Sequence, residues 1–148
     1  GYSENRINQR LKSIEVRKEL TDEWERRGVK RGQEFATLTD IIMQGWSGMT
    51  TRQYKRYKGL KTESLRDNMT NLELVLNMLA EATTTEISKE RRPRTFAANR
   101  IVAAQGGRIA GNTRREIEAE TGKKIISRLN AEQVLAAKEI EQNEEEKE

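Results

Sequence analysis

The sequence predicts an all-α protein, a compact multi-helix domain of short and long helices around a central capped amphipathic helix. Three observations support this fold class. The chain of 148 residues contains a single proline. Good helix formers, namely Glu, Lys, Arg, Leu, Ala and Gln, dominate its composition. Apolar side chains recur three or four residues apart, whereas the alternation typical of strands is rare.

The chain is expected to begin with two helices. Ile7, Leu11 and Ile14 share one helical face and predict a first helix over residues 4–20. Thr21 is then expected to start a short second helix that carries Trp24 and ends at the next glycine.

Glycines divide the following part of the chain. A third helix is predicted over residues 31–44, where Gly45 and Gly48 break it. Thr50 is expected to cap a short helix that ends at Gly59, because a threonine hydroxyl accepts an amide hydrogen bond and glycine favours the left-handed stop.

The central helix is predicted over residues 70–87. Thr70 and Glu73 have the spacing of a capping box, in which each side chain bonds the backbone N–H of the other residue. An apolar stripe follows the cap, and we expect it to be buried in the core of the domain: Leu72, Val75, Leu76 and Leu79.

Two further helices are expected beyond Pro93. Thr95 is a cap for a long helix over residues 96–120, and Asn130 is a cap for a last helix over residues 131–142.

Charge divides the chain into two parts. Residues 1–128 hold 26 basic and 17 acidic side chains, whereas residues 129–148 hold 2 and 7. We therefore predict a basic helical domain over residues 1–128, followed by a C-terminal helix and a partly disordered acidic tail over 129–148. A basic domain favours a polyanionic partner, above all nucleic acid.

The strongest nucleic-acid candidate is a cluster in which cations alternate with tyrosines. Cations on a rigid element can bind phosphates, and a tyrosine can stack on a base. The alternative is that the tyrosines are core contacts and the cations only face solvent. The cluster contains Arg52, Tyr54, Lys55, Arg56, Lys58 and Lys61.

A second basic cluster is rich in arginine, which suits bidentate phosphate contacts. The alternative is ion pairing within the chain, for example with glutamates 116, 118 and 120. The candidate residues are Arg91, Arg92, Arg94 and Arg108.

Small residues recur every fourth position in the long helix, at Ala103, Gly107 and Gly111. A helix face without long side chains lets another backbone approach closely. We predict a homodimer contact there, since twofold pairing is the commonest association of one chain type, with packing by a helix of the same chain as the alternative.

Several classes of function are excluded or disfavoured by composition. The chain has no cysteine and no histidine, which removes thiol nucleophiles, imidazole bases and the usual zinc ligands. We therefore expect no enzyme, no catalytic residues, no cofactor and no metal. No apolar run is long enough to cross a membrane, so we also expect a soluble, cytoplasmic protein without a membrane partner.

A long segment resembles a known family. The run Lys58-Gly59-Leu60-Lys61-Thr62-Glu63-Ser64-Leu65-Arg66-Asp67-Asn68-Met69-Thr70, with its continuation through residues 72–87, is similar to the C-terminal half of the DNA-damage-inducible protein D (DinD) family. Members of that family usually carry an N-terminal domain of the BRO type, which is shared with phage antirepressors. This chain lacks that domain, and we expect it to be a fragment.

The resemblance implies a non-enzymatic role in the DNA damage response (SOS). Its implied partners are DNA, with single-stranded DNA favoured, and a recombinase filament that the protein would regulate. The rival interpretation is a module of the phage-antirepressor type that only oligomerises or binds a repressor, and a nuclease is third. Salt-dependent DNA binding would favour the first interpretation, a tight dimer that does not bind DNA the second, and metal-dependent cleavage of DNA the third.

Overall fold

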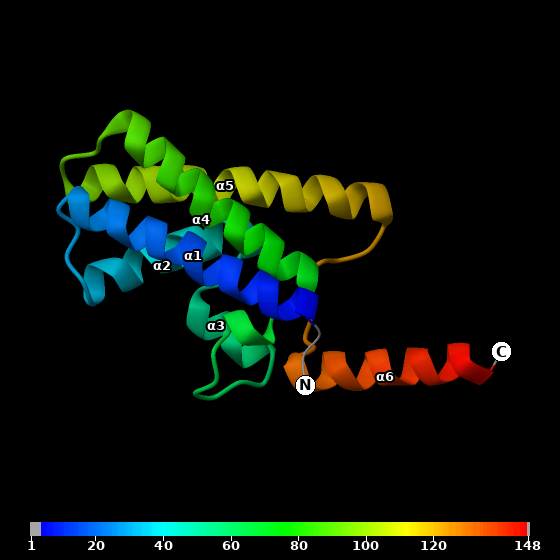
Figure 1. Ribbon diagram of the computed structural model, residues 1–148. Helices are drawn as coiled ribbons and strands as arrows, with labels where there is room; N and C mark the ends of the chain where they lie inside the picture. The colour runs from blue at the N-terminus through cyan, green and yellow to red at the C-terminus, as the bar shows by residue number, and fades with distance from the viewer. Residues whose placement is uncertain (1–3, 148) are drawn as a thin grey trace.

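Residues 4–147, which the computed structural model describes, form six α-helices and one 3₁₀ turn and contain no strand (Figure 1). The all-α class is therefore confirmed. In chain order the elements are α1 (Glu4–Arg26), α2 (Gln33–Ser47), α3 (Thr51–Tyr57), η1 (Arg66–Asn68), α4 (Asn71–Arg91), α5 (Phe96–Thr121) and α6 (Ala131–Lys147).

Helix α1 is continuous where the sequence predicts two helices. The Thr21 hydroxyl donates to the Lys18 carbonyl (3.1 Å) and so does not cap a new helix. Leu20 and Trp24 lie on the same buried side of α1, with 0 % and 1 % of their surface exposed. Burial of this stripe outweighs the local capping preference of Thr21, because most helical stability in proteins comes from packing.

Helix α2 also extends further than predicted. Gly45 lies inside the helix, which ends at Ser47. Gly48 has φ 81° and donates its N–H to the Gln44 carbonyl (3.0 Å). Only the second of the two glycines therefore stops α2, and it does so in the left-handed conformation that glycine adopts without strain.

Helix α4 is the central helix, and its capping box is confirmed. It packs against α1, α2 and α5. The Thr70 N–H donates to Glu73 Oε1 (2.9 Å), and the Glu73 N–H donates to Thr70 Oγ1 (3.4 Å). Two of the amides that a helix start leaves unpaired are satisfied in this way.

The buried face of α4 differs from the prediction. Of the four expected core residues only Leu76 is buried, with 2 % of its surface exposed, whereas Leu72, Val75 and Leu79 are 36 %, 42 % and 37 % exposed. The buried face is mostly polar, and its polar groups bond to neighbouring helices or to the preceding turn of α4. Its members are Glu73, Leu74, Leu76, Asn77, Ala80, Glu81, Thr84, Thr85 and Ser88.

The core surrounds two buried tryptophans. Trp24 packs at a tilt against Phe35, with ring centroids 5.3 Å apart, and Trp46 packs against Tyr54 at 5.9 Å. The Trp46 indole N–H donates to Asn77 Oδ1 (3.3 Å). The aromatic residues thereby join α1, α2, α3 and α4.

The stripe of small residues on α5 packs against α2 of the same chain. A Cβ atom on Gly107 would lie 2.7 Å from the Ile42 carbonyl oxygen, and one on Gly111 would overlap the Gly45 carbonyl oxygen. Ala103 is also fully buried. The prediction of a homodimer contact at this stripe is therefore wrong. The alternative holds, because a helix of the same chain occupies this face.

The two C-terminal helices begin at the predicted caps. Thr95 Oγ1 accepts the Ala98 N–H (3.1 Å), and Asn130 Oδ1 accepts the Gln133 N–H (3.1 Å). Helix α6 runs to Lys147, further than the predicted end at residue 142. In Figure 1 it leads away from the other helices.

Candidate nucleic-acid interface

An open cleft of about 600 Å³ lies among α1, α2, α3 and the loop that follows α3. Four cations and one carboxylate line it, together with threonine hydroxyls and one aromatic ring. Three of the four cations belong to the first predicted cluster. The lining residues are Arg17, Gly32, Phe35, Ala36, Thr39, Asp40, Thr51, Arg52, Lys55 and Lys61.

Helix α3 is fixed at its start so that Arg52 and Lys55 line the cleft. Thr50 and Gln53 form a second capping box, with hydrogen bonds of 3.2 and 2.9 Å. The Thr51 N–H donates to Asp40 Oδ1 (3.0 Å), which ties α3 to α2. Within the described part of the chain, the side chains of Arg52 and Lys55 enter no hydrogen bond or ion pair, so both can bind an incoming anion.

Arg17, which lines the cleft, is bound to a buried carboxylate. Arg66 binds Glu81 through two hydrogen bonds of 2.9 and 3.0 Å, and Arg17 binds the same carboxylate at 3.1 Å. Only 3 % of the Glu81 side chain is exposed. Because two guanidinium groups share one carboxylate, this group of three side chains keeps a net positive charge.

A second pocket of about 240 Å³ adjoins the cleft. It shares Arg17, Thr39, Thr51 and Lys55 with the cleft and is also lined by Arg66 and Glu81. The Arg17 guanidinium donates to Thr39 Oγ1 (2.9 Å) and lies 5.3 Å from the centre of the Trp24 ring. Arg17 is therefore held by three partners at the place where the cleft and the pocket meet.

Phe35 gives the cleft an apolar wall. Its ring is half-buried and leans on Trp24, so one part faces the core and another lines the cleft. An aromatic face beside cations is the combination that binds an unstacked base next to its phosphate. The sequence analysis named neither Phe35 nor Arg17 as a binding residue, because residues of α1 and α2 meet the α3 cluster only through the fold.

The binding role predicted for two residues of the first cluster is wrong. Tyr54 is fully buried, and its hydroxyl donates to Glu73 Oε2. Lys58 is 2 % exposed, and its ammonium donates to Glu73 Oε1 (2.8 Å) and to the Leu129 carbonyl (2.6 Å). Both side chains therefore stabilise the fold and are unavailable to phosphate. Arg56 is exposed but does not line the cleft.

The environment of this pair shifts both pKa values. Burial raises the pKa of the Tyr54 hydroxyl, and the neighbouring Glu73 carboxylate raises it further. Burial lowers the pKa of the Lys58 ammonium, while the hydrogen bond to Glu73 opposes that shift. Glu73 thus serves as helix cap, hydrogen-bond acceptor and counter-ion at once.

The second predicted cluster is joined by cations from another part of the chain. The connections α1–α2 and α4–α5 lie at the same end of the molecule (Figure 1). There the Glu23 carboxylate accepts the Ser88 hydroxyl (2.6 Å) and Arg27 Nε (2.7 Å), which links α1 to α4. We call the exposed cations of these connections the basic end: Arg26, Lys30, Arg31, Arg91, Arg92 and Arg94.

Arg92 has an unusual backbone for a residue with a side chain. Its φ of 50° and ψ of 59° place it in the left-handed region as the C-cap of α4. It is the only non-glycine residue with positive φ between residues 4 and 147. Glycine would adopt this conformation without the steric penalty of a Cβ atom, so the position presents an exposed cation at an energetic cost.

The cleft and the basic end are neighbours, because Gly32 lines the cleft and directly follows Arg31. Arg108 is the exception among the predicted arginines. It lies twelve residues after the start of α5, which is about 18 Å along a helix. The structure therefore unites most of the two clusters into one surface and leaves Arg108 apart.

Between residues 4 and 147 no group of three His, Cys, Asp or Glu side chains is placed to hold a metal ion. No helix in that range is long and apolar enough to cross a membrane.

Comparison with the families of known proteins gives a match. The model of the family described as the DinD C-terminal domain matches residues 2–142. No curated protein and no solved structure matches the chain.

Proposed function

Because the chain belongs to the DinD C-terminal domain family, we propose that it acts in the cytoplasmic response to DNA damage as a non-enzymatic protein that binds DNA. The observation that carries this proposal is the cleft, where Arg52, Lys55 and Lys61 stand beside a partly exposed aromatic ring. Phosphates would bind the cations, and this sequence-independent attraction gives most of the affinity in such complexes.

The cleft favours a single strand over a duplex. A single strand can turn an unstacked base toward Phe35, whereas the bases of a duplex are already stacked on each other. The hydroxyls of Thr39 and Thr51 supply further groups for a phosphate or a base edge. The strand would then continue past Gly32 to the basic end.

The test is a titration of a fluorescent oligothymidine with the protein across a salt series, measured by anisotropy. The variant reverses three cleft charges, in Arg52→Glu, Lys55→Glu and Lys61→Glu together. We expect its affinity to fall at least about tenfold and its salt slope to fall by about two units, since each lost contact to a single strand removes roughly 0.7 units.

A matched control keeps the total charge change the same. Arg115, Lys123 and Lys124 are exposed near the far end of α5, and their reversal to glutamate is expected to leave the salt slope nearly unchanged. Equal losses of DNA affinity in both variants would mean that binding depends only on the net charge of the protein and not on the cleft. No binding by the wild-type protein at low salt would remove the proposal for this domain.

A recombinase filament on single-stranded DNA is the second partner that we propose, as implied by the family. Repeating the titration on recombinase-coated DNA tests it, with stronger binding to the coated strand expected.

The exposed apolar side chains of Ile7, Leu11 and Ile14 on α1 favour one other function. It is an antirepressor-type module that oligomerises or binds a repressor without touching DNA. That module would associate with itself or with a protein partner and would give no anisotropy change with DNA.

A further inference from the structure

The N-terminal half of α1 carries an apolar stripe on its exposed side. Ile7, Leu11 and Ile14 are 49 %, 60 % and 50 % exposed, and they follow one another at the spacing of a single helical face. The residues that α1 buries in the domain lie on another side of the helix, from Ser13 to Trp24. A contiguous apolar stripe of this kind on the surface usually marks a contact with another molecule.

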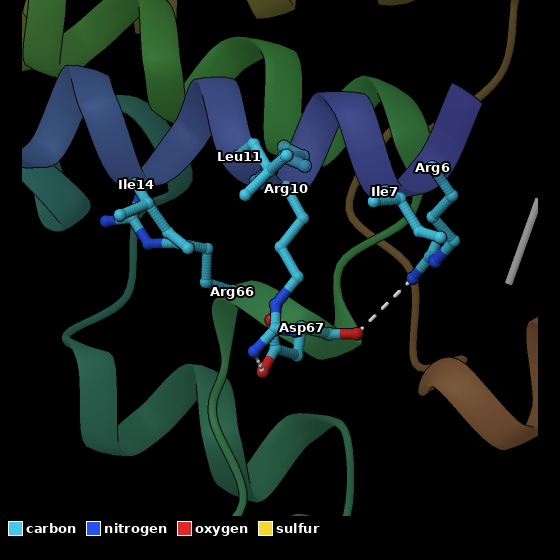
Figure 2. A pocket seen from close by; sticks show the side chains of 8 residues that line it. Arg6, Ile7, Arg10, Leu11, Ile14, Arg66 and Asp67 are labelled. Carbon is cyan, nitrogen blue, oxygen red and sulfur yellow. Dashed lines mark hydrogen bonds and ion pairs between the residues drawn. The ribbon is translucent and has the colours of Figure 1, made fainter. Parts of the chain in front are cut away.

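The stripe forms one wall of a groove of about 160 Å³ between α1 and η1. Leu74 adds an apolar side chain to the lining of the groove. Arg6, Arg10 and Arg66 also line the groove. Figure 2 shows Arg10 reaching from α1 to Asp67 on η1, a pair joined by hydrogen bonds of 2.7 and 3.2 Å. Arg6 reaches the Asp67 carbonyl oxygen from the same helix, at 3.3 Å. The groove is therefore apolar inside and mainly positive at its rim.

Helix α6 has the complementary features. It begins beside the groove, where the Ala131 N–H donates to Asn68 Oδ1 of η1 (2.9 Å), and then leads away from the other helices (Figure 1). Ile140 on it is 59 % exposed. The sequence of α6 contains six glutamates and two lysines in 17 residues. An unsupported helix of this length is marginal in water, so α6 needs a surface to pack on.

We propose that α6 of one chain packs into the α1 groove of a second copy, and that the same contact in reverse completes a twofold dimer. In this dimer Ile140 covers the stripe, and the exposed Glu139 and Glu144 of α6 face the arginine rim. A second copy is the favoured occupant because α6 leads away from the rest of its own chain (Figure 1) and leaves Ile140 exposed. The contact is isologous, as in most dimers of one chain type. It does not depend on DNA binding.

The absence of cysteine from the chain makes a clean cross-linking test available. Two single variants, Leu11→Cys and Ile140→Cys, are mixed and oxidised, and the disulfide-linked dimer is measured. We expect the mixture to form it at least fivefold faster than a mixture of Ile140→Cys with Ile101→Cys. Ile101 is the matched control because it is also 59 % exposed but lies on α5.

Equal cross-linking in both mixtures would overturn the proposal. A closed monomer in the Leu11→Cys, Ile140→Cys double variant would also overturn it, because α6 would then occupy its own groove. Sedimentation adds an independent measurement: the wild-type chain is expected to dimerise, and Leu11→Glu to weaken the dimer at least tenfold while its circular dichroism stays unchanged. A wild-type chain that stays monomeric at millimolar concentration, or a dimer unaffected by Leu11→Glu, contradicts the proposal.

Discussion

Gly107 of α5 lies directly against Gly45 of α2. A Cβ atom built on Gly45 would be 2.8 Å from both the Cα and the carbonyl carbon of Gly107, closer than real Cβ contacts come. The two backbones therefore meet without side chains between them. Gly111 repeats the arrangement one turn further along α5, against the Gly45 carbonyl oxygen. This contact holds α2, and with it one wall of the cleft, against the long helix.

Replacement of Gly107 by alanine tests this contact, because close packing decides whether the free energy of unfolding rises or falls. In an ordinary helix interior, Gly→Ala stabilises by about 0.5–1 kcal/mol. Here the added methyl group would force α2 and α5 apart, and we expect a loss of about 1–3 kcal/mol in the free energy of unfolding. Urea unfolding followed by circular dichroism measures it. Arg108→Ala, at the exposed neighbouring position, should change stability by less than about 0.5 kcal/mol. A stabilised Gly107→Ala variant would contradict the close packing.

Two neighbouring positions of α4 test which face of that helix is buried. Leu76→Ala is expected to lower the free energy of unfolding by about 2–5 kcal/mol, because the side chain is fully packed and its removal leaves a cavity. Val75→Ala removes a side chain that is 42 % exposed, and it should cost less than about 1 kcal/mol. Similar costs for both substitutions in urea unfolding would mean that α4 is rotated from the orientation described.

Local signals in the sequence predicted the fold class and most helix starts. Thr50, Thr70, Thr95 and Asn130 each cap the helix expected of them, because a cap depends on residues three or four positions apart. The orientation of α4 could not be predicted in the same way. Its most apolar stripe looked like the core, but the buried face is mostly polar, and several of its partners come from distant segments.

In the candidate site, too, local features could be predicted and contacts between distant segments could not. The α3 cluster was visible as a run of cations, yet the run itself could not show that Tyr54 and Lys58 point inward to Glu73. Arg17 and Phe35 were missed because they join the cleft from helices that are distant in the chain. The small residues of α5 did predict close packing, and only the fold identifies α2 as the partner.

The contrast between two lysines of the same cluster tests the corrected assignment. Lys58→Met should cost about 3–5 kcal/mol in stability, because it leaves the buried Glu73 carboxylate without its counter-ion. Lys55→Met removes a cation of the cleft and should leave stability within about 0.5 kcal/mol of wild type. Urea unfolding gives the first comparison, and anisotropy titration of DNA with Lys55→Met gives the second. If Lys58→Met unfolds like the wild type, the buried pair is not formed.

The lowered pKa of the Glu23 carboxyl predicts how the stability of the fold depends on pH. Its carboxylate is fully buried between α1 and α4. Burial alone would raise its pKa, but hydrogen bonds from Arg27, Ser88 and Arg26 more than offset that effect and hold the pKa below its ordinary value of 4.5. The folded state therefore binds this proton less readily than the unfolded state does. The stability that Glu23 contributes is fully present well above pH 4.5 and is lost as pH falls through the lower, folded-state pKa.

Glu23→Gln isolates this contribution. At pH 7 the variant should be less stable than the wild type by about 1–3 kcal/mol, since its neutral amide cannot replace the charge-assisted bonds to the two arginines. The gap should narrow as pH is lowered from about 5 toward 3, because the wild-type carboxylate then becomes protonated as well. Urea unfolding at a series of pH values measures the gap, with Glu19→Gln, an exposed glutamate on the same helix, as the control whose curve should parallel the wild type. A gap between wild type and Glu23→Gln that stays constant down to pH 3 would mean that the carboxylate has the same pKa in the folded and unfolded chains, and that its contacts with Arg27 and Ser88 do not favour the charged form.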